Sequence, residues 1–192
     1  MRVILYKHTI GCLLLFSLNL VFAQKTYNTE IKSARLNLEG KSLSGYSTQF
    51  DFDREDVRKG WWEYAREFGS PLNMKTYYKI TIPSETTDGN VDLEIFTQTT
   101  EIKGGSSFFL GVANKKYDEQ AKSMILDFKK NIYIDYYIEL ITFRIDKSDD
   151  LGKQYRDEEL ERKRAEILKQ INQLEEEVEW LKNKIKTIEK SN

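Results

Sequence analysis

The stretch Leu160–Ile188, LERKRAEILKQINQLEEEVEWLKNKIKTI, sets the expected architecture of the carboxyl-terminal part of the chain. Its apolar residues recur at alternating spacings of four and three in a strongly charged background. This heptad pattern predicts a coiled-coil helix that needs a partner helix, because so narrow an apolar stripe is not stable alone in water. The expected interface comprises Leu160, Ile167, Ile171, Leu174, Val178, Leu181, Ile185 and Ile188.

The residue types along this seam favour a parallel homodimer. β-Branched residues fill the a positions apart from Arg164, and mostly leucine fills the d positions, which is typical of two-stranded parallel coils. In that arrangement Glu177 would face Lys182 of the other chain, and Lys184 would face Glu189. Each exposed pair contributes only about 0.2–1 kcal/mol. Arg164 would place two like charges together, so the coil is expected to tighten towards its carboxyl end.

Two other arrangements of the seam remain open. The helix could fold back at Gly152 and lie antiparallel on Tyr133, Tyr137 and Ile141 of the preceding segment, or it could pair with a different envelope protein. The stretch 148–152, Ser-Asp-Asp-Leu-Gly, predicts a hinge, because turn-forming residues cluster there and the composition changes abruptly after it.

The remainder of the chain predicts an α+β head with an antiparallel sheet and helices on one face. Alternating apolar residues indicate two strands before Asp53 and three strands after it. Asp53 is expected to cap a helix that runs to Phe68, and a longer helix is expected over 117–145. A strand over 132–143 remains an alternative, because that stretch is rich in β-branched and aromatic residues.

The amino terminus has the three parts of a secretory signal peptide. A short basic region is followed by an apolar run from Ile10 to Ala23, with Val21 and Ala23 placed for cleavage before Gln24. The protein is therefore expected to be exported to the periplasm or the cell exterior. The expected divisions are signal peptide 1–23, flexible segment 24–33, head 34–147, hinge 148–152 and coiled-coil helix 153–192.

The composition excludes several kinds of active site. Of 192 residues, the only histidine and the only cysteine are His8 and Cys12, both inside the expected signal peptide. The mature chain would have no thiol or imidazole, which excludes sites built on them, such as Cys nucleophiles, Ser-His-Asp triads and His or Cys zinc sites. With 30 basic and 31 acidic residues, no nucleic-acid partner is implied, and no cofactor or membrane span of the mature chain is expected.

These observations favour a non-enzymatic envelope protein that makes contacts through its head and oligomerises through its coiled coil. The alternative is a module that binds an apolar or carbohydrate-like ligand between the sheet and the long helix. A hydrolase that uses carboxylates alone is a third hypothesis. It ranks last because enzymes most often use histidine for acid–base work, and the mature chain would have none. The side chains expected to contact a ligand or partner are Trp62, Tyr77, Tyr78, Tyr133 and Tyr137.

Several motifs resemble a group of exported proteins of Bacteroidota that have no assigned activity. The resemblance covers most of the mature chain and implies a location in the cell envelope, but it implies no catalytic residue. The residues that carry it are Gly45-Tyr46-Ser47-Thr48, Asp53-Arg54-Glu55-Asp56-Val57, Lys59-Gly60-Trp61-Trp62-Glu63-Tyr64-Ala65-Arg66, Tyr77-Tyr78-Lys79-Ile80-Thr81-Ile82-Pro83, Phe108-Phe109-Leu110-Gly111 and Phe22-Ala23-Gln24.

Overall fold

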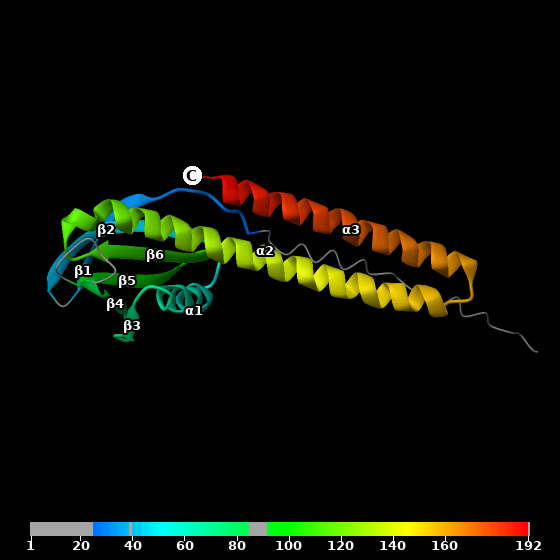
Figure 1. Cartoon of the computed structure of the whole chain (residues 1–192), viewed down its shortest axis with the longest axis horizontal. Coiled ribbons are helices and arrows are strands. Elements are labelled where there is room, and N and C mark those ends of the chain that lie inside the picture. The colour runs from blue at the N-terminus through cyan, green and yellow to red at the C-terminus, as the bar shows by residue number, and fades with distance from the viewer. Residues whose placement is uncertain (1–24, 39, 85–91, 192) are drawn as a thin grey trace, which may run out of the picture.

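The computed structural model describes residues 25–38, 40–84 and 92–191 (Figure 1). The expected signal peptide lies outside these residues, and so does Asp88-Gly89, a residue pair that predicts a hairpin turn. The described chain forms a head made of a sheet and helices, from which two long helices extend together (Figure 1).

The head is built on a six-stranded antiparallel sheet, which confirms the α+β class and the antiparallel pairing. Pro71 lies in an edge strand, where a missing backbone donor does not interrupt the sheet. In spatial order the strands are β1 (Lys32–Leu38), β2 (Lys41–Phe50), β6 (Gly105–Val112), β5 (Leu93–Ile102), β4 (Tyr78–Ile82) and β3 (Ser70–Asn73).

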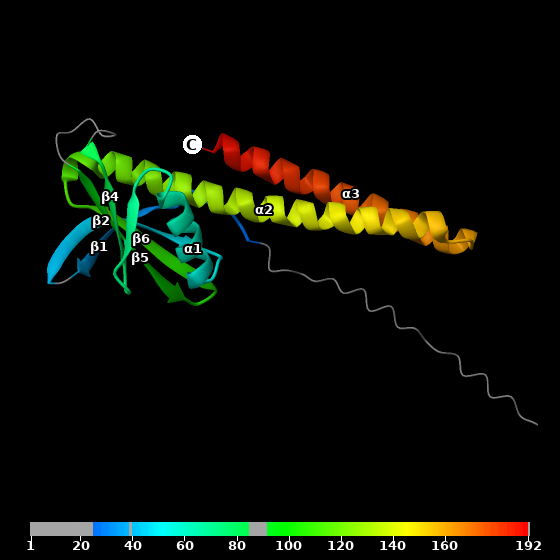
Figure 2. The same cartoon turned by 60° about the horizontal axis from the view of Figure 1, so that its bottom comes forward.

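Helices α1 (Arg54–Ala65) and α2 (Asp118–Asp157) cover one face of this sheet, as expected (Figure 2). A one-turn helix, η2 (Lys115–Tyr117), leads into α2. Phe108 of β6 is fully buried and lies 5.1 Å, between ring centroids, from both Trp61 of α1 and Phe128 of α2. Burying each such ring contributes roughly 2–3 kcal/mol, so these aromatic contacts fix both helices on the sheet.

Helix α1 differs from its expected form at both ends. Asp53 is the N-cap residue, but its side chain makes no capping hydrogen bond, so the predicted role of the carboxylate is wrong. The helix ends at Ala65 rather than Phe68, because the amide of Glu67 bonds to the carbonyl of Tyr64 in a tighter turn. Phe68 still packs against Trp61, with 6.3 Å between ring centroids, so it belongs to the core without being helical.

Helix α2 is longer than expected. It spans 40 residues and includes 132–143, which settles the strand alternative in favour of a helix. It also runs through 148–152, so the predicted hinge is wrong. Gly152 costs only about 1 kcal/mol in a helix, and its neighbour Leu151 is buried. The chain reverses instead between the end of α2 and the start of α3 (Glu161–Lys190).

Helix α3 folds back beside α2 to form an intrachain helical hairpin (Figures 1 and 2). This is the antiparallel alternative, although the reversal lies beyond Gly152. The seam faces α2 along most of its length, while Leu160 at its start is 58 % exposed. Arg144 of α2 bonds to Glu177 of α3 at 2.7 Å. The buried seam residues are Leu174, Val178, Leu181 and Ile188.

Candidate interaction site

The helical hairpin carries most of the exposed large apolar side chains of the described chain. Of eight such side chains, two lie in or directly after β3, five lie on α2 and α3, and one, Leu160, caps the start of α3 at the tip of the hairpin. Phe143 is the most open, with 63 % of its surface exposed. Exposed apolar residues concentrated on one part of a soluble protein are typical of a protein-contact surface. The six of the hairpin are Ile138, Phe143, Ile145, Leu160, Leu168 and Trp180.

The width of the seam explains why these residues stay exposed. Residues seven apart lie on the same side of a helix, and Ile138 and Ile145 form such a pair, one position beyond Tyr137 and Arg144. Helix α3 covers only one narrow stripe of α2, so residues beside that stripe are left uncovered. The apolar side chains at these flanking positions do not take part in the packing of α2 against α3. They are therefore available to a further binding partner.

A groove of about 440 Å³ opens between the two helices, at a place where α2 presents polar side chains to α3. Arg144 and Ser148 occupy this part of α2, and the Arg144 side chain bends towards Glu177 and the carbonyl oxygen of Leu140. Because the Arg144 side chain bends away, the short Ser148 side chain does not fill the space between the two helices. The groove is lined by Arg144, Ile145, Ser148, Asp149, Leu174, Glu175, Val178, Glu179 and Lys182.

A second feature lies at the base of the hairpin, where residues 25–31, here called the strap, cross α2. The segment 24–33 was expected to be flexible, but the described strap is held by several contacts and residues 32–33 belong to β1. The amide of Thr26 donates to Asp51 at 2.7 Å, and the hydroxyl of Tyr137 donates to the carbonyl of Lys25 at 2.7 Å. Polar and aromatic groups on the head thus pair with residues that were expected to lie free.

Lys129 is a fully buried ammonium group beneath the strap. It donates to Asn28 Oδ1 and to Thr48 Oγ1, both at 2.8 Å. Burial lowers the pKa of Lys129 to about 8, although the nearby Asp51 and Glu30 carboxylates oppose this. No pattern in the sequence predicts a role for Lys129, because lysine is normally exposed and no motif includes it.

Tyr133 and Tyr137, two of the five expected contact residues, lie under the same strap. The ring of Tyr133 packs edge-on against Tyr27 at 5.5 Å between centroids, and burial raises the pKa of Tyr133. Both tyrosines are almost fully buried, so they hold the strap rather than a free ligand site. Phe50, Phe108 and Phe128 pack together between the sheet and α2, in the space expected to take a ligand.

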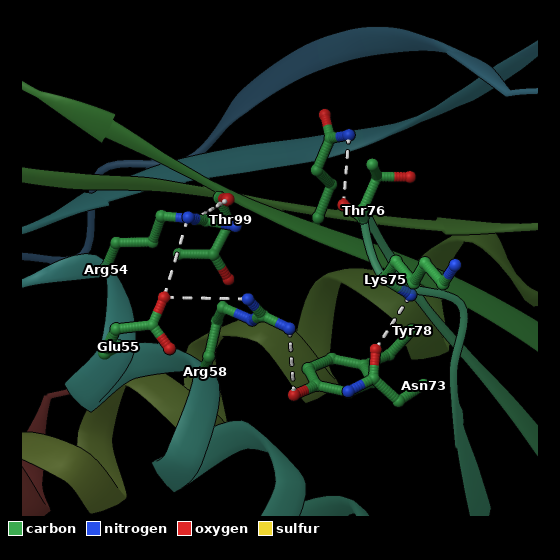
Figure 3. A network of polar contacts seen from close by, with 9 residues as sticks. Arg54, Glu55, Arg58, Asn73, Lys75, Thr76, Tyr78 and Thr99 are labelled. Atoms are coloured by element: carbon green, nitrogen blue, oxygen red, sulfur yellow. Dashed lines mark hydrogen bonds and ion pairs between the residues drawn. The ribbon is translucent and has the colours of Figure 1, made fainter.

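The structure brings Trp62 and Tyr78 together but separates them from Tyr77. Trp62 lies 5.4 Å from Tyr78, and the Arg58 guanidinium carbon lies 5.2 Å from the Tyr78 ring centroid. Figure 3 shows Arg54 and Arg58 converging on Glu55, at 3.5 and 3.6 Å.

Tyr77 pairs with Phe96 at 6.2 Å. Tyr77 precedes β4, and its partner Phe96 is the register partner of Lys79, which points to the face opposite Tyr78; Tyr77 therefore lies away from the Tyr78 ring. The five expected contact residues therefore do not form one site.

No group of acidic residues, within the ranges that the structure describes, is arranged to hold a metal ion. No helix in that part of the chain is long and apolar enough to cross a membrane. Comparisons with protein-family models, with curated proteins and with solved structures found no match to this chain.

Proposed function

We propose that this protein is a non-enzymatic assembly factor of the cell envelope, in which the head carries a helical hairpin that binds another protein. The observation that carries the proposal is the concentration of exposed large apolar side chains on the hairpin, including Ile138, Phe143 and Ile145. Protein interfaces gain much of their affinity from a few such apolar anchors, and the groove beside Ser148 offers a place for a partner's side chain.

The rest of the proposal rests on the sequence. The predicted signal peptide supports export, and the absence of thiol and imidazole groups from residues 24–192 supports a role without acid–base or nucleophilic chemistry. The heptad pattern of α3 also supports assembly, because the seam holds α3 on α2 and so builds the hairpin that carries the exposed side chains.

A second candidate function is the binding of a carbohydrate-like ligand at Trp62, Tyr78 and Arg58. The specific observation in its favour is that a partly exposed indole stands beside a phenol ring and a guanidinium group. Titration of an oligosaccharide panel, read by tryptophan fluorescence, would test it against a Trp62→Phe variant. A signal that survives in Trp62→Phe would rule out this site.

The proposed function is tested by photo-crosslinking in envelope extracts. A crosslinking amino acid placed at position 138 should attach the same protein in repeated experiments, and Phe143→Glu or Ile145→Glu should weaken that capture about tenfold. Asn131→Glu is the matched control, because it adds the same charge to an exposed position of α2 beside the head. Capture that is equal in all variants would contradict the proposal.

A further inference from the structure

The outer face of α3, turned away from α2, has a charge order that is complementary to itself. Residues 172–179 contain four glutamates and no basic residue; Glu177 pairs with Arg144 of α2, and the other three glutamates are exposed. Residues 180–190 contain four lysines and one glutamate, a net charge of +3. Two such helices attract one another when they run in opposite directions, because the acidic block of each then meets the lysine block of the other.

Trp180 stands at the boundary between the two blocks. Its indole is 42 % exposed, and Lys184 Nζ lies 5.0 Å from the ring centroid. A shallow groove of about 640 Å³ lies beside it, so the indole stands next to open space. Tryptophan is among the residues most often found at the energetic centre of an interface. The groove is lined by Asn172, Glu175, Glu176, Glu179, Trp180 and Asn183.

The charges of this outer face are only partly satisfied within the chain. Lys182 bonds to Glu179 at 2.7 Å. Glu176 and Lys186, in contrast, form no ion pair with any residue in the described ranges, and both are exposed. They are therefore open to charges on a partner.

We propose that a second copy of this chain binds antiparallel on the outer face of α3, across a two-fold axis near residue 181. Glu176 and Lys186 are each five residues from that point, so each Glu176 faces Lys186 of the other copy. Both Trp180 side chains then lie beside the axis, as an isologous interface requires. A parallel copy in register would instead place glutamates against glutamates and lysines against lysines, which is unfavourable.

This inference builds on the proposed role of the hairpin as an assembly surface and names a second copy as its partner. It differs from a parallel coil through the apolar seam, because that coil would require α3 to leave α2. Here the hairpin stays closed and uses a face that α2 does not cover. The Ile138 and Phe143 positions on α2 remain available for a different protein.

Sedimentation equilibrium of the chain 24–192, from micromolar to millimolar concentration, tests the inference. The wild type should reach the mass of a dimer, and added salt should weaken the association because its pairs are exposed. Trp180→Ala should raise the dissociation constant at least about tenfold. Leu168→Ala is the matched control, since it truncates another exposed apolar residue of α3 outside the interface and should leave the constant unchanged.

Charge reversal identifies the pairing. Glu176→Lys or Lys186→Glu alone should weaken the dimer, and the double variant should restore it, while circular dichroism shows unchanged helix content in each. A wild type that is monomeric throughout, or a dimer that responds to neither Trp180→Ala nor the reversals, would overturn the inference. Crosslinking of a different protein at position 138 tests the proposed function separately.

Discussion

Lys129 is the residue whose environment departs most from what its type prefers. A lysine is rarely fully buried unless its ammonium group is paired, and here Asn28, Thr48 and the strap complete its surroundings. The Thr48 hydroxyl, which accepts from Lys129, in turn donates to the carbonyl of Glu30 at 2.7 Å. This gives the ammonium group a second, indirect connection to the strap. The buried amine therefore links three segments that are distant in sequence: the strap, β2 and α2.

Stability should increase from neutral pH to about pH 9.5 because of Lys129. The pKa of Lys129 is lowered to about 8 in the folded chain, whereas an unfolded lysine titrates near 10.4, so between these values the unfolded state binds more protons. The free energy of unfolding should rise by about 1–3 kcal/mol across this window. Above about pH 10 the raised pKa values of Tyr64 and Tyr133 reverse the trend, because folding then opposes ionisation of these phenols.

Urea unfolding at several pH values measures this effect, and Lys129→Met is the control. The variant has no amine to titrate, so its stability should stay level over the window in which that of the wild type rises. A wild type whose stability is flat or falls between pH 8 and 9.5 would show that the buried amine does not titrate as described.

Helix α2 is the element that organises the molecule. Its first half contributes Ile125, Phe128 and Tyr133 to the core of the head, and its second half carries α3. One unbroken helix of 40 residues thus joins the two parts. Asp150, in the stretch that was expected to bend, forms an ion pair at 2.8 Å with Lys153, the first residue beyond it.

Gly152→Ala should stabilise the protein by up to about 1 kcal/mol, because alanine is the better helix former. A Cβ at this position would meet only the Arg156 guanidinium, at 3.9 Å, so there is room for it. Guanidinium unfolding measures the change. Gly45→Ala is the contrasting variant and should destabilise, because a Cβ there would clash with the backbone of Leu110 and Gly111. A destabilised Gly152→Ala protein would indicate that a hinge at this position matters.

At the scale of the whole molecule, the hairpin extends from the head and is packed most closely where it meets the head. The carboxyl end of α3 returns to α2, where Lys130 Nζ lies 3.5 Å from the carbonyl oxygen of Glu189. Ile188 and Leu181 are buried at this end, whereas Leu160 at the far end is exposed. Packing is therefore tightest near the head and loosest at the tip.

Changing Leu174 and Leu181 together to lysine should detach α3 from α2. Two charges would be buried against α2 without partners, which costs several kcal/mol and exceeds what the remaining seam contributes. Hydrogen exchange should then become fast along α3 while the strands of the head stay protected. The Leu168→Lys variant, at an exposed position, should leave exchange unchanged. Protection of α3 that survives the double change would contradict the hairpin packing.

Local patterns in the sequence were sufficient for the α+β class, the antiparallel sheet with helices on one face, and the heptad seam of α3. These features follow from the period of apolar residues, which each segment carries by itself. The position of the hinge was wrong, because the turn residues at 148–152 are outweighed by the packing of Leu151 in a continuous helix.

Only the tertiary structure decided which partner the seam takes and how the strap is held. An apolar stripe is satisfied equally by a second chain or by a helix of its own chain, and the described chain brings α2 to it. The burial of Lys129 depends on Asn28 and Thr48, which lie 101 and 81 residues away in sequence. No short-range pattern encodes such contacts, because their free energy arises only when the segments meet.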